Sequence, residues 1–222
     1  MAQAVRLFLV SEHPPFRELI SLLCGELEQE ENKIQEPVAN ADWFYRITTP
    51  FDSRYLQLVQ AITAPEIGCV SFDIFDTAVL RPFYQPTDLF RLMDEEFYHM
   101  VPEESRRFSS LRVLAEAELR REKLYTSGAS REEITLPEIY QYFQQYTALS
   151  QGTVDRMMKM EIQLEITFCT PRRSVQNLYQ IAKVCGKKIA FTTDMYLSRE
   201  TITAILKKCG YDTWDFLFIS CE

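Results

Sequence analysis

Two short segments of the 222-residue chain end in groups that could do chemistry together. In CVSFDIFDT a mostly apolar run leads into Asp73 and Asp76, and in FTTDMYL a similar run leads into Thr193 and Asp194. A carboxylate can attack phosphorus or carbon to form a covalent intermediate, a hydroxyl can hold a phosphate oxygen, and a divalent cation can bridge carboxylate and substrate. The two segments are therefore candidate parts of one active site.

Each segment also has a purely structural interpretation. Asp and Thr often end strands, because their side chains bond the backbone that follows. For an Asp-x-x-Asp pair alone, this plain interpretation is favoured. Two such ends in one parallel core change the balance, because reactive groups collect just past the carboxyl ends of parallel strands.

The elements that must position these groups can be predicted from periodicity and caps. The predicted strands are residues 67–72, 187–193 and 216–220. The first is short and apolar, as expected of a strand buried on both faces of a parallel sheet. Thr170-Pro171 is expected to start a helix that ends at Gly186, and Ser198 to cap a helix that Gly210 closes. Strand, helix, strand, helix, strand predicts an α/β fold with two right-handed parallel crossover units.

The long segment between the first two predicted strands has helical periodicity. The predicted helix caps in it are Thr87, Thr135 and Thr153. Thr135 and Glu138 have the spacing of a capping box, and a further helix is expected at about 103–124. Residues 158–168 alternate between apolar and polar, the period of a strand, but they are good helix formers and we predict a helix. Near the N-terminus, helices are predicted at 15–27 and 54–62.

Composition excludes some classes of function. The formal net charge of -8 argues against binding to nucleic acid or to anionic lipid surfaces, and no segment approaches the length of a membrane span. The six cysteines are scattered, with no CxxC pair and no nearby histidine cluster. Free thiols in a reducing cytoplasm are therefore expected.

The segments FDIFDT and FTTDMYL together resemble the first two motifs of the haloacid dehalogenase (HAD) superfamily. With LRPF, PTDLF, EITLPEIY, the pair Glu161 and Glu165, GKKIAFTTDMYLS and ILKKCGY, the chain from about residue 67 to 222 resembles the HAD-like module often found with bacterial glycosyltransferases of surface-polysaccharide synthesis. The resemblance implies a parallel Rossmann-like HAD core with a helical cap inserted after the first strand, preceded by a helical N-terminal extension. The implied division is 1–65 extension, 66–80 first part of the core, 81–169 cap and 170–222 second part of the core.

The resemblance also implies a function, that of a hydrolase acting on a phosphorylated small molecule or sugar phosphate. Asp73 would be the nucleophile and would bind Mg²⁺, with the backbone carbonyl of Phe75 as a second metal ligand. Thr193 would hold the transferring phosphoryl group, with Thr192 as the alternative. Thr77 would fix the loop after the strand, and Asp194 would lie with these substrate-binding groups.

Two departures from the family pattern favour an alternative, a weak or inactive HAD-like module that binds a partner such as a glycosyltransferase. Phe75 stands where the phosphatases have their acid/base aspartate, and Asp76 stands where glycine is usual. Asp76 could replace the missing acid only if the loop turns its side chain back; otherwise it caps the turn or orients Thr77. The family's later lysine and acidic motif are also absent before Glu222, so the core is expected to be incomplete.

The basic residues of the chain have a simpler interpretation. Solvated faces and ion pairs are expected to account for the pairs Arg106-Arg107, Arg120-Arg121 and Arg172-Arg173. Arg81, eight residues after the proposed nucleophile, is the exception, since it is expected near the hinge of the cap.

Overall fold

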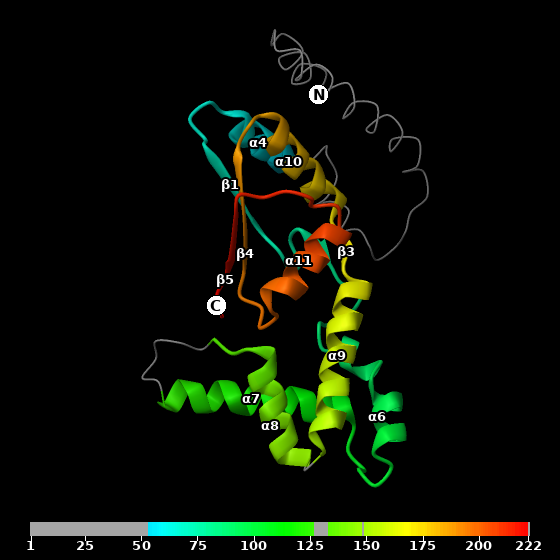
Figure 1. Cartoon of the computed structure of the whole chain (residues 1–222). Coiled ribbons are helices and arrows are strands. Elements are labelled where there is room, and N and C mark those ends of the chain that lie inside the picture. The colour runs from blue at the N-terminus through cyan, green and yellow to red at the C-terminus, as the bar shows by residue number, and fades with distance from the viewer. Residues whose placement is uncertain (1–52, 127–132, 148, 222) are drawn as a thin grey trace, which may run out of the picture. The chain divides into compact units, whose positions relative to one another are not determined.

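The chain is a mixed α/β protein with a small parallel sheet. A computed structural model describes residues 53–126, 133–147 and 149–221 (Figure 1). Strands β1 (Cys69–Asp73), β4 (Lys188–Thr193) and β5 (Phe216–Ile219) form this sheet in the order β1-β4-β5. The described helices are α4 (Ser53–Thr63), α5 (Asp88–Arg91), α6 (Asp94–Met100), α7 (Phe108–Thr126), α8 (Leu136–Thr147), α9 (Gln151–Phe168), α10 (Arg173–Val184) and α11 (Arg199–Lys208). The predicted α/β class is confirmed, whereas the predicted helix 15–27 lies outside the described residues.

The described residues fall into two compact units. One lies within Met1–Val70 and Arg173–Ile189, and the other within Ser71–Arg172 and Ala190–Glu222. Strands β1 and β4 each begin in the first unit and continue into the second.

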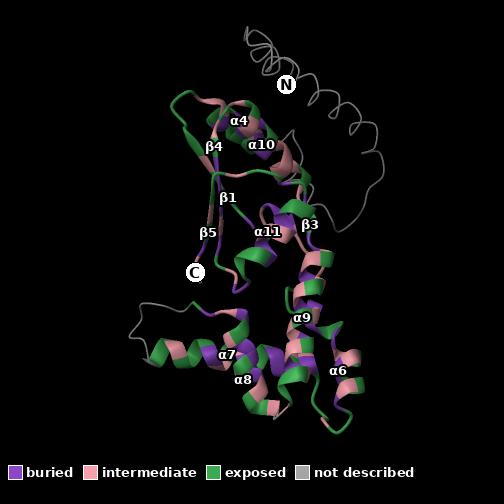
Figure 2. Cartoon of the chain, viewed as in Figure 1, coloured by how far each residue is buried: buried purple, intermediate pink, exposed green. Residues whose placement is uncertain are grey.

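In the first unit, helices α4 and α10 pack against each other. Helix α4 buries Tyr55, Val59 and Ile62, which recur at helical spacing on one face (Figure 2). Gly186 has a φ of 65° and ends α10 in a Schellman motif, in which the N–H of Lys187 bonds the carbonyl of Ala182 at 2.9 Å. The predictions of helix 54–62 and of Gly186 as a helix terminator are confirmed.

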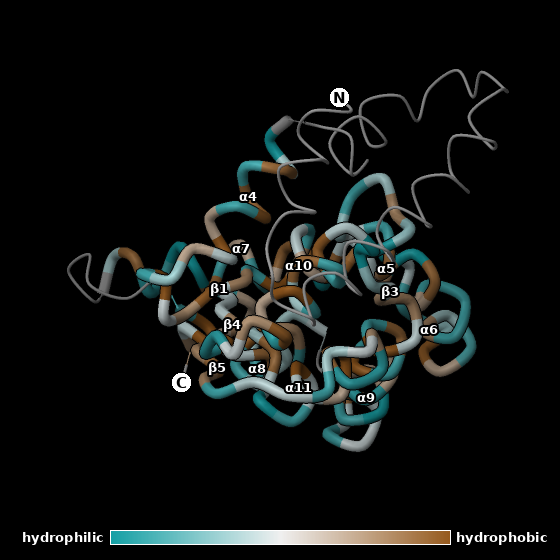
Figure 3. The backbone as a smooth tube through the Cα atoms, turned by 90° about the horizontal axis from the view of Figure 1, so that it is seen from above, coloured by the Kyte–Doolittle hydropathy of each residue, from teal (hydrophilic) through white to brown (hydrophobic). Residues whose placement is uncertain are grey.

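In the second unit, a two-residue ladder joins the ends of the helical segment. Strand β2 (Val79–Leu80) pairs antiparallel with β3 (Thr170–Pro171), so the chain leaves for α5 and returns from α9 at one place. Helices α5 to α9 carry both hydrophobic and hydrophilic residues (Figure 3). Their buried side chains include an aromatic cluster of Phe90, Phe97, Phe108, Tyr140 and Phe143.

Several helix boundaries follow the predicted caps. Thr135 and Glu138 form the capping box, with the N–H of Thr135 bonded to the Glu138 carboxylate at 2.8 Å and the N–H of Glu138 to the Thr135 hydroxyl at 3.4 Å. Ser198 caps α11, and Gly210, at φ 78°, ends it. Residues 158–168 are helical, as predicted.

Other predictions about helix boundaries hold only in part or are wrong. Thr87 stands at the N-cap position of α5 as predicted but makes no side-chain capping bond, and two short helices, α5 and α6, replace the single helix expected. The helix expected from about 103 begins at Phe108, because Glu104 bonds both the N–H and the guanidinium of Arg106 and forms a turn. The cap of α9 is Ser150 rather than Thr153.

Two predictions about strands are also wrong. Thr170 and Pro171 do not start a helix, because they pair with Leu80 and Val79 in the ladder, and α10 begins at Arg173. Strand β1 is not buried on both faces: Phe72 is buried, whereas the alternate residues Cys69, Ser71 and Asp73 are exposed. Its position at one end of the order β1-β4-β5 gives it one neighbour, β4, among the strands that the structure describes.

Candidate active site

An open cleft of about 610 Å³ lies at the carboxyl ends of the parallel strands in the second unit. The described residues that line it are Asp73, Phe75, Asp76, Arg81, Thr192, Thr193, Asp194, Met195, Phe218, Ile219 and Ser220. The cleft thus brings together every predicted site residue except Thr77. That residue is half-buried in the loop after β1 and is not among the described lining residues.

The register of the strands sets the ends of β1 and β4 side by side. The N–H of Ile74 bonds the carbonyl of Thr192 at 3.1 Å, and Thr193 pairs with Ile219 of β5. Asp73 and Asp194 are exposed, and Thr193 is buried. The Thr193 Oγ1 accepts the N–H of Met195 at 3.2 Å, so its own O–H remains available to donate toward a ligand.

The loop after β1 is tightly fixed. Asp76 has a φ of 57°, in the left-handed region that favours glycine. The N–H of Val79 bonds the carbonyl of Ile74 at 2.8 Å, and the Ala78 carbonyl accepts the Tyr211 hydroxyl at 2.7 Å. The backbone conformation at Asp76 is therefore one that glycine adopts at less cost.

Two arginines contact Asp76: Arg81, which directly follows β2, and Arg172, which directly follows β3. The Arg81 Nη2 lies 3.3 Å from the Asp76 Oδ2, and the Arg172 Nη2 donates to the Asp76 carbonyl at 2.6 Å. The Arg172 side chain is therefore not the solvated surface group that was expected, and burial lowers its pKa. The contact between Arg172 and Asp76 was not predicted from the sequence. The only hint was the position of Arg172, directly after Pro171 at the end of the helical segment.

Arg81 connects the cleft to a buried glutamate on α9. Its Nη1 lies 3.5 Å from the Glu165 Oε1, and its guanidinium lies 5.0 Å above the ring centre of Phe75. Burial raises the pKa of Glu165 to about 7; the charge of Arg81 opposes this rise and the charge of Glu161 adds to it. The Cys169 thiol, whose pKa burial raises to about 12, donates weakly to the same carboxyl at 3.9 Å.

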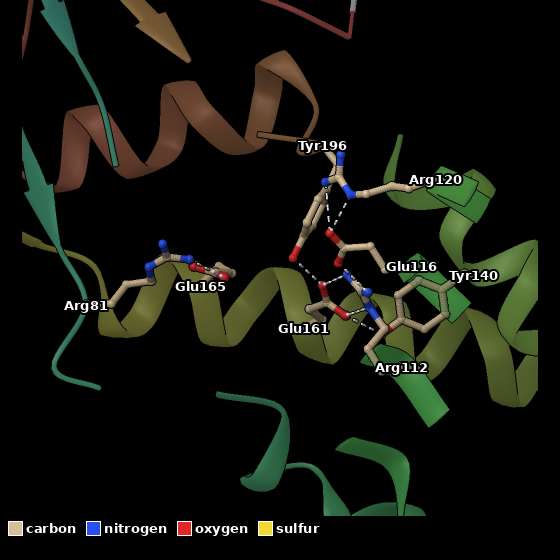
Figure 4. Close-up of polar contacts among 8 residues, drawn as sticks. All are labelled: Arg81, Arg112, Glu116, Arg120, Tyr140, Glu161, Glu165 and Tyr196. Carbon is tan, nitrogen blue, oxygen red and sulfur yellow. Dashed lines mark hydrogen bonds and ion pairs between the residues drawn. The ribbon is translucent and has the colours of Figure 1, made fainter. Parts of the chain in front are cut away.

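One turn earlier on α9, Glu161 is the centre of a fully buried polar network (Figure 4). Arg112 Nε and Nη2 donate to its two oxygens at 2.9 and 2.8 Å. The Tyr140 hydroxyl donates at 2.8 Å, and the Tyr196 hydroxyl lies at 3.5 Å. Burial alone would lower the pKa of Arg112, but Glu161, Tyr196 and Tyr140 raise it well above its usual range.

The network ties the helical segment to the strand end that carries Thr193. Tyr196 follows Thr193 by three residues, and its carbonyl accepts the N–H of Leu136 at the start of α8. Sequence reasoning missed Arg112. The available signal was that Arg112, four residues after Phe108, falls on the apolar face of α7.

The predicted metal ligands, the Asp73 carboxylate and the backbone carbonyl of Phe75, line the cleft together with Asp194, whose carboxylate was predicted to lie with the substrate-binding groups. Among the residues that the structure describes, no three His, Cys, Asp or Glu side chains are grouped to hold an ion. Mg²⁺ usually keeps several waters and binds through one or two carboxylates plus substrate phosphate. The donors therefore fit an ion held jointly with substrate rather than one enclosed by protein.

No protein-family model matches the chain, and a search of curated protein sequences gives no significant match.

No helix in the described part of the chain is long and apolar enough to cross a membrane. The five cysteines among the described residues form no disulfide bond with one another.

Proposed function

We propose that this protein is a hydrolase of the HAD type that cleaves a phosphorylated small molecule or sugar phosphate through Asp73. One observation carries the proposal: Asp73, Thr193 and Asp194 line the same cleft at the ends of adjacent strands. Open parallel sheets bind their ligands at the carboxyl ends of the strands, where these polar groups lie. The segment α5–α9 then serves as the cap that selects the substrate.

The reaction has two balanced steps. In the first, an Asp73 carboxylate oxygen attacks phosphorus, the bond from phosphorus to the ester oxygen breaks, and the leaving alcohol takes a proton from water or an acid. In the second, water attacks the phosphorus of the aspartyl phosphate, the bond to the Asp73 oxygen breaks, and inorganic phosphate leaves with a proton passing to solvent. Asp73 is restored as a carboxylate.

The other residues orient the phosphoryl group. The Thr193 O–H donates to a phosphoryl oxygen, because the Thr193 Oγ1 already accepts from the N–H of Met195. Asp73, Asp194 and the Phe75 carbonyl would hold Mg²⁺, which supplies charge neutralisation for the transferring group. Thr77 holds the backbone of the loop from outside the lining of the cleft.

A second candidate is a weak or inactive module that binds a partner such as a glycosyltransferase. The observation in its favour is that Phe75 occupies the position of the family's acid, while the Asp76 carboxylate is paired with Arg81. A missing general acid costs on the order of 10²- to 10⁴-fold in rate. Slow but Asp73-dependent turnover agrees with the hydrolase, and no turnover agrees with the binding module.

The test is an assay of the full chain on a panel of phosphate esters with Mg²⁺. The key variant is Asp73→Asn, which keeps the shape of the side chain and removes the nucleophile. Asp155→Asn, on α9 and bonded to Gln151, is the matched control outside the cleft. Turnover that Asp73→Asn abolishes and Asp155→Asn preserves supports the hydrolase. No turnover by folded wild-type protein counts against it.

A further inference from the structure

Arg81 is the one cationic residue among the described residues that line the cleft, and it makes few of the bonds that it could make. Arginine carries five N–H donors. Nη2 lies 3.3 Å from Asp76 and Nη1 lies 3.5 Å from Glu165. The Nε is buried and has no hydrogen-bond partner. The guanidinium therefore has unused donor capacity.

Its two carboxylate partners compensate its charge only in part. The Arg81 side chain is 7% exposed, whereas that of Asp76 is 68% exposed and competes with water. Burial disfavours the charged form of Glu165 and raises its pKa to about 7, so near neutral pH it compensates the Arg81 charge only in part. Both contacts are also longer than the 2.7 to 2.9 Å or so that is usual for charged pairs.

Arg112 provides a comparison within the same unit. Both arginine side chains are largely buried and face a buried glutamate of α9, but Arg112 makes two bonds of 2.9 and 2.8 Å to Glu161. Arg112 lies outside the cleft lining and is fully paired inside the protein, whereas Arg81 lines the cleft and is not. A buried charge that is incompletely paired needs a further partner.

We propose that Arg81 binds a phosphoryl oxygen of the substrate, and that the Asp76 carboxylate is its substitute partner in the free protein. This inference rests on the proposed function and adds to it a binding residue for the phosphate monoester in its anionic form. The cleft also exposes Asp73, Asp76 and Asp194, which repel such a ligand unless a cation lies nearby. The planar fork of the guanidinium matches phosphate geometry.

Two opposite effects on phosphate affinity follow. Loss of the charged hydrogen bonds in Arg81→Gln is expected to weaken binding at least about tenfold. Removal of the competing charge in Asp76→Asn is expected to tighten binding, by up to about fivefold, since Asp76 is an exposed ion-pair partner. Tighter binding in Asp76→Asn that persists in the Arg81→Gln background would reflect lost repulsion alone, and would count against Asp76 as the substitute partner of Arg81.

The experiment is calorimetric titration of inorganic phosphate into the full chain with Mg²⁺, for wild type and variants. Arg91→Gln, whose side chain is 74% exposed on α5, is the control. If Arg81→Gln does not fold, Arg81→Gln with Glu165→Gln keeps the buried charges balanced and is expected to show the same weakening.

Failure of this inference and failure of the hydrolase give different results. Unchanged phosphate affinity in both Arg81 variants, beside turnover that depends on Asp73, overturns the role of Arg81 alone. Loss of phosphate binding in those variants without turnover in wild type supports the Arg81 site and counts against the hydrolase. No phosphate binding by folded wild type overturns the role of Arg81, and the turnover assay alone then decides on the hydrolase.

Discussion

The buried pair of Arg112 and Glu161 gives the sharpest prediction about stability. Both side chains have no exposed surface, and two short hydrogen bonds join them. Arg112→Met removes the cation but leaves the Glu161 carboxylate in a place that water does not reach. Breaking a buried pair in this way costs about 3 to 5 kcal/mol in the free energy of unfolding.

A second substitution separates the charge effect from the loss of packing. Glu161→Gln in the Arg112→Met background removes the stranded charge and keeps an oxygen for the Tyr140 hydroxyl, which donates to Glu161 at 2.8 Å. We expect the double variant to recover at least about 2 kcal/mol of the loss, since an uncompensated buried charge is the main cost. Arg120→Met, on the same helix but 43% exposed, should change stability by less than about 1 kcal/mol.

The assay is urea unfolding, followed by far-ultraviolet circular dichroism, for wild type, Arg112→Met, Arg120→Met and the double variant Arg112→Met with Glu161→Gln. A loss below about 1 kcal/mol in Arg112→Met would refute the reasoning, because exposed pairs are worth that little. A double variant no more stable than Arg112→Met would show that lost packing, rather than the stranded carboxylate, accounts for the cost.

Two further predictions concern the loop and its neighbours. Burial raises the pKa of Glu165 from 4.5 to about 7, so the folded state keeps its proton longer than the unfolded state, and this contribution to stability is lost as pH rises from 4.5 to about 7. The free energy of unfolding of Glu165→Gln should therefore rise relative to that of wild type across this window, by about 3 kcal/mol at the upper end, given about 1.4 kcal/mol per pKa unit. Urea unfolding at several pH values measures this difference, and a difference that does not change with pH would contradict the prediction. At Asp76, with φ 57°, alanine should be less stable than glycine by about 1 kcal/mol or more in thermal unfolding. Both variants lose the contact with Arg81, so a difference between them reports the backbone conformation alone. Equal stabilities would show that the conformation at position 76 costs alanine nothing relative to glycine.

The sequence predicted best what is decided locally. The capping box at Thr135, the cap at Ser198 and the terminator Gly186 depend on residues within a few positions, and all three are confirmed. The strand at Thr170 was missed because its partner, Leu80, is 90 residues away. No local pattern signals such a pairing.

The same distinction applies to the candidate site. Asp73 and Thr193 could be found because each follows an apolar run that ends a strand. Arg112 and Arg172 could not, because their partners lie 49 and 96 residues away, and arginine is usually a surface residue. The sequence left two roles open for Asp76, a replacement acid or a residue that shapes the turn. Its conformation and its contact with Arg81, which bear on this choice, could not be predicted from the sequence.

The central claim, a nucleophilic Asp73, is tested most directly by trapping the covalent intermediate. The full chain is mixed with an aryl phosphate and Mg²⁺, quenched in acid during the first turnover, digested and examined by mass spectrometry. The account predicts one phosphoryl group on the peptide that contains Asp73, and none in Asp73→Asn. Turnover without this adduct, or an adduct that persists in Asp73→Asn, would contradict it.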